Sequence, residues 1–256
     1  SGSKRSELRA RAVRTLKSAS DASYRKAAGA LDKLVADERL SDLERHWIVN
    51  GFSCTIMPEG LAGLKEVPGV KKIFTSGQAG GPRQAAGTER PPVFDPVAQP
   101  QFDSRQYRHP WYTRYLLPDR VWDKFGITGE GTLNVVHDFN FVYSDNTLAN
   151  LYRNPNETPA NGQDDDGNGL VDDAYGYNFD LDSPHLTLRQ VPETALVPQL
   201  MHAFMCASII CGSGSAGKPY EFGLAPRGRW AGVIASRRVE AAVQWAIEQG
   251  ADTYSM

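Results

Sequence analysis

A histidine stands near the start of an apolar stretch, and its surroundings raise the question of whether it does chemistry. The segment QLMHAFMCASIICG, residues 199–212, places His202 among apolar and small residues that predict a buried helix. A single histidine in such a helix usually packs and forms hydrogen bonds within a core. A catalytic role for His202 therefore requires a partner from elsewhere in the chain.

Asp138 is the candidate partner. It ends the segment TLNVVHD, residues 132–138, whose apolar residues predict a short buried strand. Active sites of parallel α/β sheets lie at the carboxyl ends of the strands. An aspartate at a strand end, followed some sixty residues later by a histidine that opens a helix, matches the first two members of an Asp, His, Ser triad.

Cys206 offers two weaker interpretations of the same helix. It follows His202 by four residues and shares its face, so a zinc site is conceivable, but Cys211 lies beyond easy tetrahedral reach and no other His/Cys cluster supplies ligands. A nucleophilic Cys/His pair is equally weak, because two residues on one helical face rarely meet in the head-on geometry that proton transfer needs.

The acidic segment DDDGNGLVDD, residues 164–173, has the spacing of a calcium loop. Its oxygen ligands at alternate positions precede Gly169, but position 12 is Tyr175 instead of glutamate. No Lys or Arg lies between Arg153 and Arg189, so the carboxylates would repel one another without a cation. The alternative is a solvated turn. We expect Ca²⁺, with these ligands: Asp164, Asp166, Asn168, Asp172 and Asp173.

The elements before residue 76 predict a small α+β unit. Residues 4–40 have helical spacing that is interrupted near Ser18–Asp21, which predicts two helices. A strand is expected within 46–57, a short helix from Pro58, and a second strand at 70–74. The following residues 76–110 lack periodicity and are rich in Gly, Gln and Pro, which is typical of a linker or a functional loop.

Residues 111–256 alternate strands with helices, which predicts an α/β domain with a parallel sheet covered by helices. The expected elements after the strand at 132–138 are a helix at 199–210, a strand at 229–235, a helix at 237–250 and a strand that starts at 251. Because a parallel sheet is buried on both faces, we expect the sheet to be incomplete at Met256.

Composition limits the partners. A chain of 256 residues with 41% hydrophobic residues can form a sizeable core, and a net charge of −2 provides no global basic field for nucleic acid. No apolar run reaches the roughly 18 residues of a membrane span. Three cysteines are too few for a disulfide framework, and an odd number cannot all be paired.

Several segments, in order, resemble the precursors of subtilisin-like serine proteases. The first, RHWIVNGFSCTIMPEGLAGLKEVPGVKKIF (45–74), is similar to the inhibitory propeptide of that family. DRVWDKFGITGEGTLNVVHDF (119–139) resembles the segment that leads to the catalytic aspartate, and residues 154–179 match an insertion of one branch of the family. GLAPRGRWAGV and VEAAVQWAIEQGADTYSM resemble a turn and a helix–strand unit of the catalytic domain.

The resemblance implies a fold, a reaction and roles for individual residues. It implies a subtilisin-like α/β domain, incomplete in this chain, after a propeptide-like domain, with boundaries at 1–75, 76–110 and 111–256. It assigns the catalytic aspartate to Asp138 and the catalytic histidine to His202, in an endopeptidase that acts on peptides or proteins. It also implies that a propeptide is processed between Ser76 and Arg108, unless that stretch is a plain tether, and it favours an extracytoplasmic location.

Two departures from the family pattern support a second hypothesis. The chain contains no counterpart of the serine motif or of the oxyanion-hole asparagine, so we expect a C-terminal serine-bearing half, covalently attached or as a second chain. Where the family has Asp-Thr-Gly and Gly-His-Gly-Thr-His, this chain has Asp138-Phe139-Asn140 and Met201-His202-Ala203-Phe204-Met205. The alternative is therefore an inactive pseudoprotease that binds a partner or regulates one.

Overall fold

The computed structural model divides the chain into two compact units, Ser1–Pro82 and Arg83–Met256. The residues that it describes are 2–75, 92–95, 98–99, 101–106, 113–186, 201–214 and 222–256. Most of the expected linker, 76–110, with the processing point expected in it, lies outside the described residues. Of the helices in the described ranges, none has both the length and the hydropathy to cross a bilayer.

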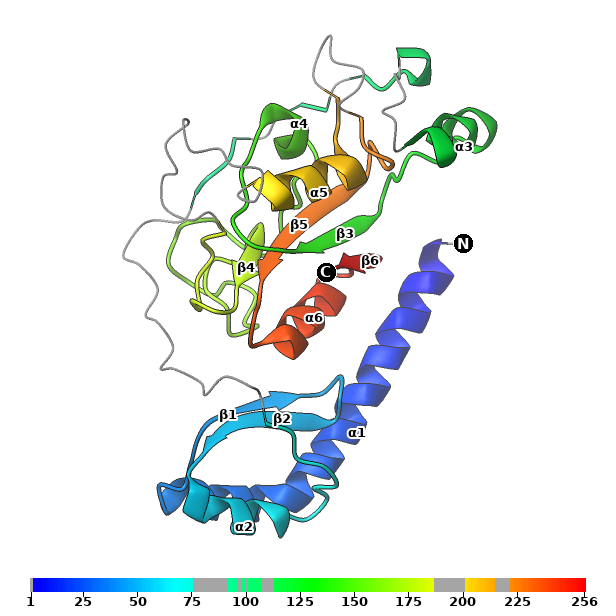
Figure 1. The fold of residues 1–256 in the computed structure, drawn as a ribbon. Helices are drawn as coiled ribbons and strands as arrows, with labels where there is room; N and C mark the ends of the chain where they lie inside the picture. Colours follow the sequence, from blue (N-terminus) through cyan, green and yellow to red (C-terminus); the bar gives the residue numbers. More distant parts are fainter. Residues whose placement is uncertain are drawn as a thin grey trace. The chain divides into compact units, whose positions relative to one another are not determined.

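The first unit combines a long helix with a hairpin and a short helix (Figure 1). Its elements are α1 (Gly2–Ala36), β1 (Leu40–His46), β2 (Gly51–Ile56), the 3-10 turn η1 (Pro58–Gly60) and α2 (Leu61–Lys65). The two strands pair antiparallel. The buried apolar side chains that hold the unit together are Ala27, Leu31, Leu34, Leu40, Leu64 and Val67. The helix expected from Pro58 is confirmed as η1 and α2.

The expected break in the N-terminal helix was wrong, because α1 is one helix of 35 residues. Ser18–Asp21 contains neither Gly nor Pro, and Ser and Asp cost a helix interior only a few tenths of a kcal/mol, roughly, relative to the best helix formers. Ser20 also lies on the packed side of the helix with an exposed fraction of 4%. Tertiary packing therefore carries the helix through the weak segment.

The strand expectations for this unit were correct only in part. The stretch 46–57 contains the end of β1, a turn and all of β2, and the turn ends at Asn50, whose φ of 48° is in the left-handed region. Asparagine tolerates that conformation better than most residues, which fits its place in a turn. Residues 70–74, expected as a strand, pair with no other strand in the described part, and Phe74 is exposed.

The second unit is built around a four-stranded, all-parallel sheet with the strand order β4-β5-β3-β6. Its longer elements are α3 (Pro118–Phe125), β3 (Leu133–His137), α4 (Asp145–Leu148), β4 (Gly176–Asn178), α5 (His202–Cys211), β5 (Arg229–Ile234), α6 (Val239–Glu248) and β6 (Thr253–Ser255). The short 3-10 turns η2 (Ser104–Gln106) and η3 (Thr113–Tyr115) precede α3. The expected α/β class with a parallel sheet is confirmed.

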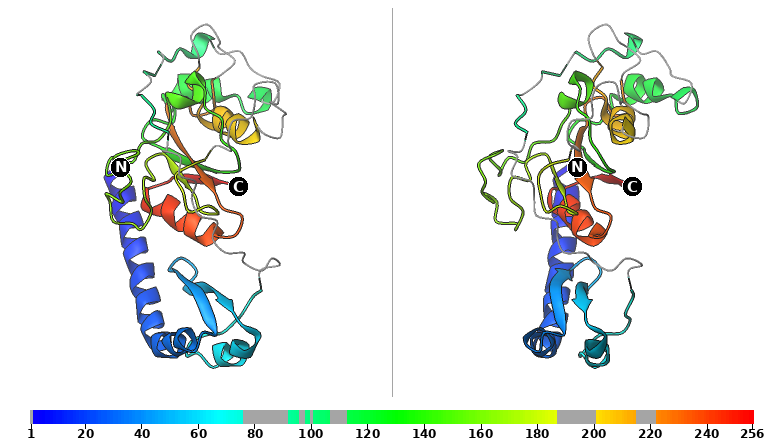
Figure 2. Two further views of the ribbon diagram at one scale, coloured as in Figure 1. Left: turned by 90° about the vertical axis from the view of Figure 1, so that its left-hand side faces the viewer. Right: turned by 60° about the vertical axis from the view of Figure 1, so that its left-hand side comes forward.

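Helices α5 and α6 cover opposite faces of this sheet (Figures 1 and 2). The α6 face buries Leu133 and Val135 of β3 with the alanines and Trp245 of α6. The α5 face buries Val136 and Trp230 with the small residues of α5. Because side chains alternate along a strand, successive residues of β3 face α6 and α5 in turn.

Candidate functional site

Asp138 lies directly after β3, at the carboxyl end of a strand that pairs on both sides. Its N–H donates to the Val233 carbonyl oxygen at 3.0 Å, so the ladder with β5 continues one residue beyond β3. Its Oδ1 accepts from the Phe139 N–H at 2.8 Å, and its side chain is 7% exposed. The carboxylate is therefore held at the carboxyl end of β3, where it was expected from the sequence.

Strand parity turns Asp138 toward α5 and its neighbour His137 toward the other face. The His137 ring lies between the Ala235 carbonyl oxygen, 2.9 Å from Nε2, and the Tyr254 hydroxyl, 3.0 Å from Nδ1. Both of its nitrogens are occupied on the α6 side, so His137 fixes the end of β3 to β5 and β6. It takes no part in the group around Asp138.

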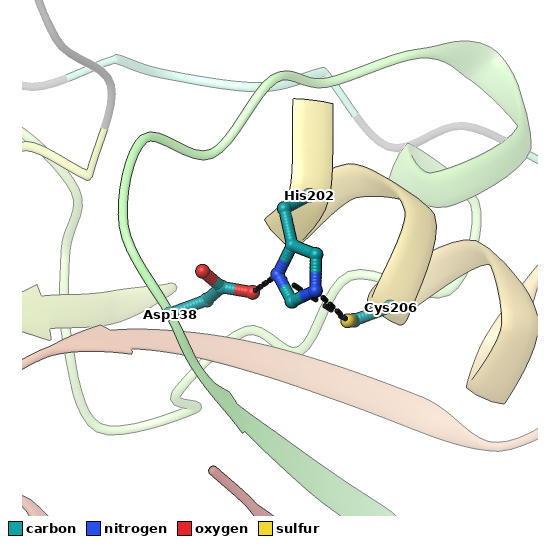
Figure 3. A group of neighbouring side chains, drawn as sticks. All are labelled: Asp138, His202 and Cys206. Atoms are coloured by element: carbon teal, nitrogen blue, oxygen red, sulfur yellow. Dashed lines mark hydrogen bonds and ion pairs between the residues drawn. The ribbon is translucent and has the colours of Figure 1, made fainter. Parts of the chain in front are cut away.

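His202 is the first residue of α5, and the buried face of that helix explains its position. Ala203, Ala207 and Cys211 recur every four residues and are fully buried, so the helix lies close against the sheet. This close packing places the His202 Nδ1 atom 2.5 Å from Asp138 Oδ2 (Figure 3). The structure thus brings together the two catalytic candidates, which are 64 residues apart.

The side chains of His202 and Asp138 differ in their exposure to solvent. The His202 side chain is 58% exposed, whereas Asp138 is 7% exposed. A carboxylate only accepts hydrogen bonds, so the proton of this contact lies on Nδ1 and Nε2 keeps its lone pair. A charge-assisted contact from a buried carboxylate orients the ring, and the exposed Nε2 side can accept a proton from a reacting group.

Two residues close to this pair in the sequence carry exposed apolar side chains. Phe139, which follows Asp138, and Met205, which is on α5 with His202, are 49% and 40% exposed. The sulfur of Cys206 lies 3.8 Å from Nδ1 and 3.9 Å from Nε2 of His202 (Figure 3). Burial, followed by the charge of Asp138, raises the pKa of the Cys206 thiol. The His202 imidazole therefore lies between a buried carboxylate and a thiol whose pKa is raised.

The acidic loop, defined here as residues 154–175, closes on itself through backbone amides. Asp164 accepts from the Asn168 N–H at 3.1 Å and from the Gly169 N–H at 2.7 Å. Gly169 has a φ of 90°, a conformation that suits glycine and turns the chain sharply after Asn168. Asp166 accepts from the Asn154 side-chain amide at 2.9 Å. The first half of the expected calcium motif is therefore folded as a loop.

The structure adds a ligand candidate that sequence reasoning missed. Glu157, Asp164 and Asp166 each have a carboxylate oxygen within 4.8 Å of the others. Glu157 Oε1 accepts from the Asp166 N–H at 3.0 Å, and the residue is 5% exposed. It comes from upstream of the motif, whereas Tyr175 at position 12 accepts a hydrogen bond from the Phe94 N–H. The only signal in the sequence was one more acidic residue in a stretch without basic ones.

Asp172 and Asp173, which were also expected as ligands, have different hydrogen-bond partners. Asp172 accepts from the Asn161 and Gly162 N–H groups at 2.9 and 3.0 Å, so both of its oxygens already have donors from the preceding turn. Asp173 is fully buried, and its Oδ2 accepts from the Asn168 amide at 2.9 Å and from Trp245 Nε1–H at 2.5 Å. Asp172 therefore stabilises the turn, and Asp173 connects the loop to α6.

Two buried oxygens of this loop lack a donor. Glu157 Oε2 and Asp173 Oδ1 have no hydrogen-bond partner among the described residues. The pKa of Glu157 is raised to about 7, mainly by burial; the nearby carboxylates of Asp173 and Asp166 contribute to the rise, and two amide donors oppose it. Burial likewise raises the pKa of Asp173 to about 6, with Asp166 and Asp164 adding to it. A cation bound by Glu157, Asp164 and Asp166 would give the Glu157 carboxylate a further partner and relieve the repulsion among these three carboxylates.

No protein-family model matches the chain, and no curated protein matches it. The assignment of function therefore depends on the geometry of the two sites and on the motifs in the sequence.

Proposed function

We propose that this chain is part of a subtilisin-like serine endopeptidase in which Asp138 and His202 are two members of the catalytic triad. The observation that carries the proposal is the 2.5 Å contact between Asp138 Oδ2 and His202 Nδ1 at the carboxyl end of a central parallel strand. The order of the two residues and the motifs that surround them support the same family.

In this proposal each residue has a defined role in peptide-bond hydrolysis. A serine attacks the scissile carbonyl carbon, and His202 Nε2 accepts the serine proton and later donates it to the leaving amine. Asp138 keeps the proton of the imidazole on Nδ1 and stabilises the imidazolium that forms. Its low exposure strengthens that interaction, because less water screens it.

The serine and the oxyanion donors would come from a C-terminal half, joined to this chain or associated with it. In the described part of the sheet, β6 pairs on one side with β3 and is an edge strand. An edge strand presents unpaired backbone groups that a further strand can use. We propose that the serine-bearing half adds to the sheet at this edge.

The first unit would serve as the inhibitory propeptide, and the linker would be cleaved between Ser76 and Arg108. An independent hydrophobic core in the unit Ser1–Pro82 supports a separately folding module. N-terminal sequencing of the mature protein tests this: a new terminus within that range supports processing, and a fully intact range contradicts it.

The acidic loop would bind one Ca²⁺ through Glu157, Asp164 and Asp166, with Asp173 Oδ1 as the next oxygen to test. The buried oxygen of Glu157 without a donor supports a cation at this cluster more directly than the spacing does. The loop ends at β4, which pairs with β5, so calcium would stabilise the edge of the sheet opposite β6.

A second candidate function is a pseudoprotease that binds a partner at the same place. The exposed apolar side chains of Phe139, which follows Asp138, and Met205, on α5 with His202, favour it, because a bound chain could cover them. Hydrolysis of a denatured protein substrate by the protein with its C-terminal half distinguishes the two. Cleavage that disappears in His202→Ala supports the protease, and specific binding without cleavage supports the pseudoprotease.

A further inference from the structure

The N-terminal part of α1 extends beyond the core of the first unit (Figure 1). Among the described side chains of α1, Ser20 is the first that is buried, and the apolar core of the unit begins at Ala27. The Nζ atom of Lys17 lies 5.4 Å from the centre of the Trp47 ring, in the turn of the hairpin. Residues 4–17 therefore form almost four helical turns, roughly 20 Å long, without a buried side chain.

Basic residues are concentrated in this overhang, defined here as residues 4–17 of α1. It contains six Lys or Arg residues and one acidic residue, so its net charge is +5, whereas the rest of the chain has a net charge of −7. The basic residues are Lys4, Arg5, Arg9, Arg11, Arg14 and Lys17. Charge that is segregated in this way creates a local positive field, which the net charge of −2 for the whole chain conceals.

Two leucines of the overhang lie exposed along one face of the helix. Leu8, Ala12 and Leu16 are four residues apart, so they form one stripe along α1. Leu8 is 65% exposed and Leu16 is 44% exposed. The core of the first unit therefore leaves most of the apolar surface of this stripe in water.

Basic side chains lie next to the exposed leucines. Three of them are three or four positions from Leu8 and so share its face of the helix. They are Lys4, Arg5 and Arg11. Glu7 directly precedes Leu8, so it projects about 100° away from that residue around the helix axis. The exposed stripe thus combines apolar and positively charged groups.

An anionic lipid surface provides partners for both kinds of side chain. Lys and Arg reach lipid phosphates while their aliphatic stems lie along the apolar layer, and leucines leave water at the headgroup boundary. A nucleic acid would attract the same charges through its phosphates, but it would leave Leu8 and Leu16 in water. We propose that the overhang lies on the surface of an anionic bilayer and binds it through its basic residues and these two leucines.

Membrane binding needs only α1 and is independent of the proposed function. If the linker is cleaved as proposed, the overhang leaves with the first unit, so processing would release the catalytic part from the membrane. This consequence rests on the proposed function. A failure of that function would leave a measured binding to vesicles intact.

The experiment is co-sedimentation of the full chain with lipid vesicles at an ionic strength of about 0.15 M, in chelator so that calcium does not bridge the acidic loop to lipid. Vesicles of phosphatidylglycerol and phosphatidylcholine in equal parts should bind the chain, and pure phosphatidylcholine should not. Each Lys or Arg near an anionic bilayer strengthens binding roughly fivefold. Arg11→Gln combined with Arg14→Gln should therefore weaken binding about 25-fold.

Arg25→Gln combined with Lys26→Gln is the matched control, because it removes two charges from exposed positions of the same helix. These positions begin roughly 16 Å beyond Arg14 along the axis, which exceeds the screening length of about 8 Å. The control should retain most of the binding. Glutamine favours helices, and circular dichroism checks that each variant is folded.

Leu8→Ala combined with Leu16→Ala distinguishes lipid from other anions. It should weaken vesicle binding roughly tenfold or more, because less apolar surface leaves water, while alanine preserves the helix. Three results would overturn the proposal: no binding to the anionic vesicles, an equal loss in the control, or unchanged vesicle binding in the leucine variant. The last result, together with tight binding of double-stranded DNA, would assign the overhang to nucleic acid instead.

Discussion

Replacing Glu157 by glutamine should separate a calcium site from a merely acidic turn. Calcium at about 100 times its dissociation constant adds roughly 2.7 kcal/mol to the free energy of unfolding. For a unit of the size of Arg83–Met256, each kcal/mol raises Tm by about 2–4 °C, so calcium should raise Tm by roughly 5–11 °C over chelator. Glu157 brings one of the three clustered carboxylates and a buried oxygen without a donor.

The substitution should reduce this response by about half. Loss of one carboxylate ligand that lowers affinity tenfold removes about 1.4 kcal/mol, which corresponds to roughly 3–5 °C of the calcium-induced rise. In chelator, Glu157→Gln should melt no lower than the unmodified protein, because the neutral amide relieves the repulsion from Asp166. Calorimetry in calcium and in chelator measures both effects.

Asp165→Asn is the matched control, because it removes one charge from the same loop. Asp165 Oδ2 accepts from the Thr158 N–H at 2.9 Å and from the Asn161 amide at 2.8 Å, and the asparagine oxygen can accept both bonds. This variant should keep the full calcium response. An equal loss in both variants would mean that loop charge alone controls stability, and an unchanged Tm in the unmodified protein would remove the site.

Three further predictions follow from individual contacts. Burial raises the pKa of Glu157 from 4.5 to about 7 and that of Asp173 from 3.8 to about 6, so in chelator their contribution to stability is complete below about pH 4 and is lost as the pH rises through 6 and 7. The calcium-induced rise in Tm should therefore be larger at pH 8 than at pH 5, and a pH-independent rise would contradict this. Gly176→Ala should cost about 1–3 kcal/mol in denaturant unfolding, because its Cβ would lie 1.9 Å from the Gly232 carbonyl oxygen; an unchanged midpoint would refute the close β4–β5 contact. Asp138→Asn should remove the low-field NMR signal of the His202 Nδ1 proton, whose persistence would contradict the charge-assisted contact.

Three of the four strands of the parallel sheet were predictable because their pattern is local, whereas β4 was not expected. The strand before Asp138 is a short apolar run, and α6 carries buried residues at helical spacing and ends at Glu248, so both elements could be placed from the sequence. The hairpin of the first unit was not, because the turn before β2 contains apolar residues such as Val49 that resemble strand residues. Its position depends on a left-handed residue, Asn50, that composition does not mark.

The Asp138–His202 pair could be predicted from the sequence more completely than the acidic loop. Asp138 and His202 could be paired through motif order, and the alternation of β3 explains why they meet. Glu157 was missed because it precedes the spaced motif, and only the fold of the loop brings it near Asp164 and Asp166.

The central claim is that Asp138 and His202 belong to an active serine triad. The most direct measurement is labelling with a fluorophosphonate probe, applied to this chain together with the C-terminal half proposed to carry the serine, with His202→Ala as the comparison. We expect labelling that depends on His202. Absence of labelling in a folded protein, or labelling that His202→Ala leaves unchanged, would contradict it.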